Sequence, residues 1–350
     1  MTTRAPARQP SHVFAGWQAF TEGAIREGWS DGLPLVPPTP DRVAAFVAAT
    51  GLAPDTVIGE ISTRDLEITL EQIAANAVMA GCRLEYMPLV LAASRAFLHP
   101  LGNAHCVAAT LAGASQLVIV NGPIRNELGI LCREGAFGPG SRANATIGRA
   151  IRLIVRNCAR SIPGESDRAA FSTPARFTFC VGEDEEASDW TPFHVERGFE
   201  PTQNVLTLNS MTDAYALFDD ASQQPEALLD RLAHLSRCRP VNADEFLGDA
   251  RTMLLIIGPE HRRLLRGAGW SKSDVRSYLY PLLTAPHTRP NVIDRHGYHA
   301  PGGPTESSVE LSKPESLLLL SAGGDGSNLS WTMFPHLASA VSIEVERLAA

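Results

Sequence analysis

The sequence lacks the features of a membrane-spanning or secreted, disulfide-rich protein. No apolar run approaches the roughly 18 residues that a membrane-spanning helix needs, and the first residues, MTTRAPARQPSHVFAGW, contain no apolar core of the signal-peptide type. The six cysteines are widely spaced, with no C-x-x-C pair, which is typical of reduced thiols rather than of disulfides or structural zinc. We therefore expect a cytoplasmic protein with no membrane partner.

An excess of basic residues and a nucleotide-binding fingerprint are also missing. The net charge is −8, which disfavours a general nucleic-acid binder, so no nucleic-acid partner is expected. The glycine-rich segment AGGDGSNLS at 322–330 has neither the Lys-Ser/Thr ending of a Walker motif nor the glycine spacing of a Rossmann motif. It is interpreted as a loop that contacts substrate through Asp325 and Ser327, and no cofactor is expected there.

Three short apolar runs indicate the fold class. They cover residues 117–120, 253–257 and 317–320, and each leads into a turn that contains glycine. Buried strands that end in glycine turns are typical of open α/β sheets, in which ligands bind at the carboxyl ends of the strands. A helix is predicted over 70–80, where Thr69 and Gln72 form a capping-box pattern. The sequence therefore predicts an α/β fold, with a mixed or parallel sheet and flanking helices.

Two pairs of similar segments suggest an internal duplication. VIVNGPIRNELGI at 118–130 parallels LIIGPEHRRLLRGAG at 255–269, and GWSDG at 28–32 resembles GWSKSD at 269–274. Short matches of this kind also arise by chance, so a single lobe is the alternative. On the duplication hypothesis, residues 1–20 are a flexible tail, residues 21–200 a first α/β lobe and residues 201–350 a second one.

A glycine turn that leads into an arginine-rich helix is the first candidate site. In FGPGSRANATIGRAIRLIVRNCAR at 137–160, Gly138 and Gly140 form the turn, and the start of the helix presents free backbone N–H groups to an anion. Arg142, Asn144 and Arg149 are the candidate substrate-binding side chains. The alternative is a surface helix whose arginines pair with acidic side chains.

An acidic run after the strand-like segment 177–181 is the second candidate. The run consists of Glu183, Asp184, Glu185, Glu186 and Asp189, and it is followed by His194, a candidate substrate contact. Carboxylates near a histidine are suited to acid–base catalysis or to binding of a hard metal ion, whereas most charge runs are simply solvated loops. A metal at His194 with Glu185 and Glu186 is therefore an open alternative. The histidine-containing segment NVIDRHGYH at 291–299 is another metal candidate.

Cys82 is the candidate nucleophile. It lies in AGCRLEYMP between two predicted helices, where Arg83 and a helix start favour the thiolate and Glu85 is a possible base. Unpaired cysteines are more often buried apolar residues, and this alternative stays open.

Several segments together resemble a known family. They are GWSDGLPLVPPT, NAVMAGCRLEYMPLVLAA, LVIVNGPI with GPGSRANATIGRA, and FCVGEDEEASDWTPFHVERGF. These strings are similar to poorly characterised bacterial proteins grouped with the UGSC-motif (seleno)protein family, which implies thiol or selenol redox chemistry in members that carry the motif. This chain has neither that motif nor a Cys-Gly-Ser-Cys equivalent. The shared strings contain Asn121, which joins the candidate substrate contacts.

These patterns favour an enzyme of the lyase or hydrolase type that acts on a small anionic or polar organic molecule. Cys82 and Glu85, with Glu185 and Glu186, are the predicted catalytic residues. Three alternatives stay open: a thiol-based oxidoreductase, a metal-dependent enzyme using His194, and a non-catalytic ligand-binding or scaffold protein. A homo-oligomer is expected.

Overall fold

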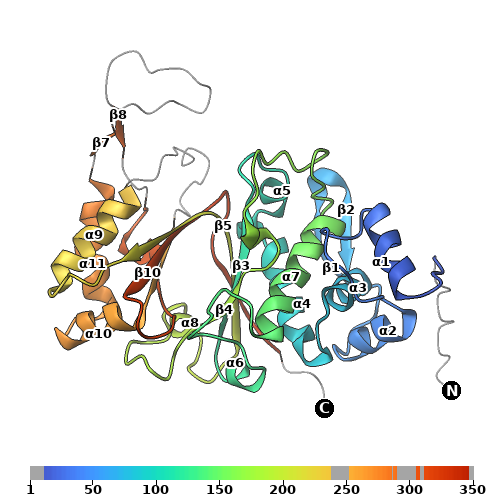
Figure 1. Cartoon of the computed structure of the whole chain (residues 1–350), viewed down its shortest axis with the longest axis horizontal. Coiled ribbons are helices and arrows are strands. Elements are labelled where there is room, and N and C mark those ends of the chain that lie inside the picture. The colour runs from blue at the N-terminus through green and yellow to red at the C-terminus, as the bar shows by residue number, and fades with distance from the viewer. Residues whose placement is uncertain (1–11, 238–251, 286, 290–304, 308–310, 347–350) are drawn as a thin grey trace.

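The chain folds around one curved mixed sheet flanked by helices, which confirms the predicted α/β class (Figure 1). The computed structural model describes residues 12–237, 252–285, 287–289, 305–307 and 311–346. The strand order in the sheet is β4-β3-β5-β10-β6-β9, and β11 pairs with β5. The β3–β4 and β6–β9 pairs are parallel and the other pairs antiparallel, so the sheet is mixed.

Two series of elements follow the same order along the chain. The first series is α4 (Met87–Leu98), β3 (Ser115–Asn121), α6 (Ile124–Glu127), α7 (Arg142–Asn157), β4 (Cys180–Gly182) and β5 (Val205–Phe218). The second series is α9 (Pro225–Arg237), β6 (Met253–Ile257), α10 (Pro259–Gly267), α11 (Lys272–Thr284), β9 (Leu317–Ser321) and β10 (Leu329–Pro335). We call these series the first half and the second half.

The strand pairing in the two halves is equivalent. In each half the first strand pairs in parallel with the second and antiparallel with the third, giving the orders β4-β3-β5 and β9-β6-β10. The third strands, β5 and β10, pair antiparallel in the middle of the sheet. This is the arrangement expected when a two-fold axis normal to the sheet relates the two halves. By this pairing β5 belongs to the first half, whereas the sequence predicts that a second lobe begins at residue 201.

The remaining elements lie mostly around the first half, and one of them, β11, pairs with β5 in the interior of the sheet. They are α1 (Trp17–Arg26), α2 (Pro40–Ala48), the hairpin of β1 (Val57–Ile61) and β2 (Leu66–Thr69), α3 (Leu70–Ala80), α5 (Ala104–Val107), α8 (Phe193–Glu196) and β11 (Val341–Glu344). A separate hairpin joins β7 (His287–Arg289) and β8 (Thr305–Ser307). Short 3-10 turns span Ser62–Arg64, Leu84–Tyr86, Pro100–Gly102, Pro174–Arg176 and Pro314–Ser316.

Local sequence signals account for the best-defined helix. α3 begins with the capping box of Thr69 and Gln72 and ends at Gly81, which has φ 88°. Only glycine adopts this conformation without strain, so the helix stops there. The prediction over 70–80 is thus confirmed. α1 lies partly within the segment expected to be a tail, and its Phe20 is buried.

Alternate residues of the strands enter different parts of the core. In β3, Val118 and Val120 pack with residues of α3, α4 and α7, whereas Leu117 and Ile119 face a core shared by both halves. The second half follows the same rule, since Leu255 of β6 packs with residues of α9 and α11, and the residues on either side of it face the shared core. This period of two is the expected pattern for strands buried on both faces.

β4 and β9, the strands at the two ends of the sheet, meet at their carboxyl ends. The backbone N–H of Asp184, just after β4, donates to Ser321 O at the end of β9 over 2.7 Å. Gly323 N then donates to Cys132 O over 2.8 Å. The curved sheet therefore brings side chains from both halves to one place. No helix in the described ranges combines the length and the apolar character needed to cross a membrane.

Candidate functional site

Four polar side chains converge at the carboxyl ends of β3 and β4. Asn121 is the last residue of β3, Glu183 and Glu185 directly follow β4, and His194 lies in α8. One atom from each of Glu183, Glu185 and His194 lies within 4.8 Å of the others. We call these four residues the polar centre. Its position is the one at which open α/β sheets bind ligands.

Asn121 connects the two carboxylates of the polar centre. Its Nδ2 donates to Glu183 Oε2 over 2.7 Å and to Glu185 Oε1 over 2.9 Å. Glu183 also accepts from Phe193 N over 2.6 Å and lies 3.6 Å from Lys272 Nζ. Burial raises the pKa of Glu183, although Lys272 and the hydrogen bonds act in the opposite direction.

Glu185 lies between the buried residues and solvent. Its Oε1 accepts from Gly122 N over 2.9 Å and pairs with Arg125 Nε over 3.2 Å. The same guanidinium donates from Nη2 to Glu186 over 2.6 Å, and this hydrogen bond, the largest influence, lowers the pKa of Glu186 to about 2. The Glu185 side chain is 13% exposed and that of Glu186 is 52% exposed, so the polar centre reaches solvent through these two residues.

His194 is completely buried, and its two ring nitrogens lack good hydrogen-bond partners. Its Nδ1 lies 4.0 Å from Glu185 Oε1, and neither ring nitrogen makes a hydrogen bond of normal geometry among the described residues. Burial lowers the pKa of His194, while Glu185 and the nearby carbonyls of Pro201 and Glu200 partly offset that effect. The Oδ1 atom of Asn121 is buried without a partner as well. Two side chains of the polar centre therefore carry unsatisfied polar atoms, which is costly in a protein interior.

The second half contributes positively charged side chains to the surroundings of the polar centre. Lys272 is buried and donates to Thr191 O over 2.7 Å and to Glu196 over 3.1 Å, besides its approach to Glu183. Asp184 pairs with Arg133 over 2.9 Å and with Arg262 of α10 over 3.4 Å. The site is thus assembled from both halves.

The corresponding position of the second half carries no such cluster. Asn121 and Ile257 each end a strand before a Gly-Pro pair, and the registers place Glu183 and Ser321 beside them. The two strand ends differ in direction, since Asn121 lies on the face of the shared core and Ile257 packs with α9 and α11. The residues that follow Glu183 and Ser321 are Asp-Glu-Glu and Ala-Gly-Gly respectively. The same strand ends therefore form with small or apolar residues, and the fold does not require the polar centre.

The arginines of α7 bind the protein itself. Arg142 donates from Nε and Nη2 to Gly81 O over 3.1 and 2.9 Å. Arg149 forms a two-point ion pair with Asp31, over 2.9 and 2.8 Å. Binding of a substrate anion by Arg142 or Arg149 stays a prediction, but it would have to compete with these bonds.

Asn144 has a structural position next to the polar centre. Its Oδ1 accepts from Leu131 N over 2.8 Å, and its Nδ2 donates to Cys180 O over 2.9 Å. Leu131 O in turn accepts from Gly182 N, the residue before Glu183. Asn144 therefore holds the start of α7 against the loop and strand that present the carboxylates. In the turn before it, Gly138 bonds to Gly135 O, and Gly140 has φ 121°.

Cys82 lies in a different environment from the one predicted. The thiol is buried and contacts Thr146 O over 3.4 Å, and burial raises its pKa to about 12. A protonated thiol disfavours the role of nucleophile, and Glu85 is exposed on a short turn after it. The cysteine beside the polar centre is Cys132, whose Sγ lies 4.0 Å from Arg125 Nη1.

The remaining predicted residues lie on or near the surface. Asp325 forms an exposed ion pair with Arg263 over 2.6 Å, and Ser327 is half-buried in the same loop. The segment 291–299, with its histidines, lies outside the described residues.

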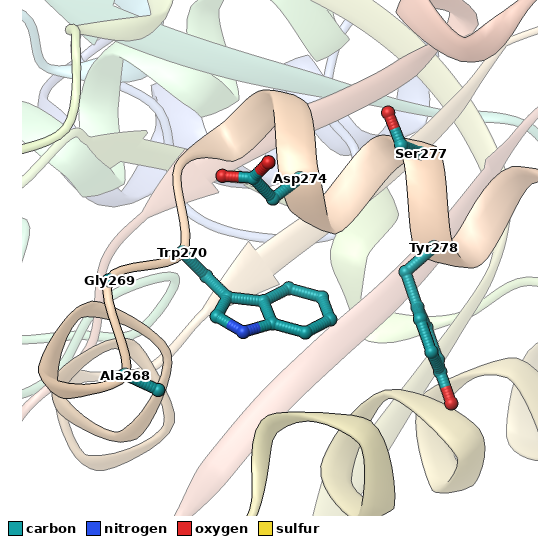
Figure 2. A pocket seen from close by; sticks show the side chains of 6 residues that line it. All are labelled: Ala268, Gly269, Trp270, Asp274, Ser277 and Tyr278. Atoms are coloured by element: carbon teal, nitrogen blue, oxygen red, sulfur yellow. The ribbon is translucent and has the colours of Figure 1, made fainter.

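A shallow pocket of about 530 Å³ lies elsewhere, at the corner between α10 and α11 (Figure 2). The Trp270 and Tyr278 rings meet edge to face at 5.5 Å, and Asp274 caps its own helix through Ser271. Tyr278 OH donates to Asp230 over 2.9 Å. These groups are occupied with one another, so the pocket supports no catalytic role.

Comparison of the chain with family models, curated proteins and solved structures finds no significant match. The resemblance to the UGSC-motif family stays a prediction. The structure brings together four predicted residues, Asn121, Glu185, Glu186 and His194, with Glu183, which begins the predicted acidic run, and adds Arg125 and Lys272. The role of Lys272 depends on the curvature of the sheet.

Proposed function

We propose that the protein is an enzyme of the lyase or hydrolase type that acts on a small anionic or polar organic molecule at the polar centre. One observation carries the proposal: buried, incompletely satisfied polar groups are gathered at the ends of β3 and β4, and the equivalent strand ends of the second half do without them. Groups that the fold does not require, and that lie where such sheets bind ligands, are best explained by chemistry.

Glu185 is the proposed general base. It is the carboxylate of the centre that combines contact with buried partners and partial access to solvent. Gly122 N and Arg125 hold its Oε1, so the carboxylate is fixed in position to accept a proton from a bound molecule. His194 Nδ1 lies 4.0 Å from Glu185 Oε1, beyond hydrogen-bond distance but close enough to act on the carboxylate electrostatically.

Arg133 is the proposed contact for an anionic group of the substrate. Its Nε is held by Asp184, one residue from Glu185, while about half of its side chain faces solvent. A guanidinium anchored on one side and open on the other is suited to bind a carboxylate or phosphate. This residue takes the role that the sequence analysis gave to Arg142.

Proton abstraction can be tested without knowing the substrate. The protein is incubated in D₂O with a panel of small hydroxy, keto and amino acids, amides and phosphate monoesters, and exchange or conversion is followed by NMR. The wild type should exchange or convert at least one compound class, and Glu185→Gln should slow this by at least about 100-fold, a typical contribution of a general base. Asp189→Asn, an exposed acidic neighbour, is the matched control.

Two outcomes count against the proposal. If the wild type leaves every compound class unchanged, or if Glu185→Gln retains the wild-type rate, Glu185 is not the base of an enzyme of this type. Binding of a compound without exchange or conversion would favour the ligand-binding alternative.

A further inference from the structure

We propose that Glu183, Glu185 and His194, with the Oδ1 atom of Asn121, form a binding site for one divalent transition-metal cation. The inference rests on the proposed function for the location of the site. With a cation bound, Glu185 would be its ligand and not the free general base, and the test does not depend on activity. One nitrogen and two carboxylate donors within 4.8 Å of one another make a donor set that suits Zn²⁺, Co²⁺, Mn²⁺ or Fe²⁺.

Buried polar atoms without hydrogen-bond partners support the cation site independently of the distances between its donors. The ring nitrogens of His194 and the Oδ1 atom of Asn121 are buried and lack hydrogen-bond partners among the described residues. A neutral imidazole binds a cation through its one unprotonated nitrogen, and an amide binds a cation through its oxygen. A cation bound to these two atoms would remove the cost of leaving them unpaired.

The existing hydrogen bonds leave room in the donor set. All three contacts that fix Glu185, from Asn121 Nδ2, Gly122 N and Arg125 Nε, go to Oε1. On Glu183, the two short hydrogen bonds go to Oε2, and Oε1 has only contacts of 3.5 and 3.6 Å, to Ser321 N and Lys272 Nζ. One oxygen of each carboxylate is therefore held by the protein and the other is available to a cation.

The contacts around the donors resemble the outer shell of a metal site. Metal-binding carboxylates are usually fixed by further hydrogen bonds, and a histidine ligand usually has a backbone carbonyl at its other nitrogen. Here Asn121 and Gly122 hold the carboxylates, and the carbonyls of Pro201 and Glu200 lie near the imidazole.

The charges around the centre also permit a cation. Glu183, Glu185 and Glu186 are contacted by two cationic side chains, those of Arg125 and Lys272. The three carboxylates outnumber these two cations, and a divalent ion would offset the excess of negative charge.

The probe for the test is Co²⁺, whose visible absorption reports on its ligands. Full-length protein is stripped with a chelator and titrated with Co²⁺ by calorimetry and absorption. We expect one site per chain, and a Kd at least about 100-fold higher in His194→Gln and in Glu185→Gln, since even outer-shell changes cost 10- to 100-fold. Asp189→Asn and His105→Gln, both at exposed positions, should bind as the wild type does.

The outcomes distinguish a cation at the polar centre from a cation bound at another place in the chain. If the wild type binds no Co²⁺ stoichiometrically, or if both ligand variants bind as tightly as the wild type, the site is overturned; the second result would direct attention to the histidines at 291–299. Thermal unfolding of each variant without metal shows whether it is folded. Should a variant not fold, the melting temperature of the wild type decides, because a bound cation must raise it with increasing Co²⁺. A protein that converts substrate but binds no Co²⁺ would overturn the metal site alone and leave the proposed function intact.

Discussion

Gly122 and Gly258 occupy equivalent positions in the two halves of the fold, each pressed against a backbone carbonyl. A Cβ atom at Gly122 would lie 2.2 Å from Gln203 O, and one at Gly258 would lie 1.9 Å from Leu329 O. The two carbonyls belong to the chain at or just before the third strand of each half, β5 and β10. The repeated topology therefore extends to a specific backbone contact at the strand ends.

This contact predicts that Gly122→Ala and Gly258→Ala each destabilise the protein by at least about 2 kcal/mol, because backbone rather than a flexible side chain must move. Gly122 adds strain, since its φ is 83°. Urea unfolding followed by circular dichroism measures the effect. Gly267→Ala, with open space around a helical glycine, should be neutral or stabilise by up to about 1 kcal/mol. Equal stability of all three variants would contradict the close contact.

Local signals in the sequence were sufficient for the fold class and for several elements. The apolar runs that predicted strands became β3, β6 and β9, and the capping box of Thr69 and Gln72 marks the start of α3. β5 was missed because it contains Asn209 and Ser210, polar residues that normally indicate a loop and are buried here. Their burial depends on partners far along the chain, which periodicity does not reveal.

The candidate site was predictable where its residues lie close in sequence. Glu185, Glu186 and His194 follow one buried strand, so they were found together. Arg125 reaches Glu185 because β3 and β4 are parallel neighbours, and Lys272 reaches Glu183 because the ends of β4 and β9 meet. The helix that carries Arg142 and Arg149 was predicted correctly. Their partners, Gly81 O and Asp31, could not be predicted because they lie far away in the sequence and come close only in the folded chain.

The cysteines should react in an order set by their surroundings. Burial raises the pKa values of Cys82, Cys158 and Cys180 to about 12, so the reactive thiolate is scarce at neutral pH. Cys106 and Cys132 are partly exposed, and although burial and the charge of Asp184 also raise the pKa of Cys132, the reagent can reach both sulfurs. Iodoacetamide at pH 7.5 should label these two at least about tenfold faster, as measured by peptide mass spectrometry of briefly treated native protein. Faster labelling of Cys82 would restore its candidacy as nucleophile.

The ion pair between Arg149 and Asp31 should make stability depend on pH. Burial raises the pKa of Asp31, but the hydrogen bond and charge of Arg149 and the backbone hydrogen bonds outweigh it, so the pKa is below its usual value of 3.8. The contribution is then complete above the unfolded pKa and is lost as the pH falls through the folded one.

We expect Asp31→Asn to cost about 1 kcal/mol at pH 7, a value kept small because the pair is partly solvated. The difference from wild type should shrink below about pH 4, as measured by urea unfolding at pH 7, 5 and 3.5. Asp55→Asn, at an exposed position, serves as the control. A difference that stays constant over this range would mean that the carboxylate charge is not what stabilises the contact.

Arg125 should be the side chain on which the carboxylates of the polar centre depend most. It is fully buried and pairs with Glu185 over 3.2 Å and with Glu186 over 2.6 Å. Removing one partner of a buried ion pair costs about 3–5 kcal/mol. Arg125→Met should fall at the lower end, because Glu186 is half exposed and can be solvated.

A double-mutant cycle identifies the cause. If the cost comes from the unpaired carboxylate, Glu185→Gln in the Arg125→Met background should restore at least about 1 kcal/mol of the free energy of unfolding, whereas the same change in the wild type should destabilise. Arg266→Met, which breaks the more exposed pair with Asp189, should cost less than about 1 kcal/mol. If the effects of Arg125→Met and Glu185→Gln on the free energy of unfolding are additive, Arg125 stabilises the fold by filling space, and the charge of Arg125 does not stabilise Glu185.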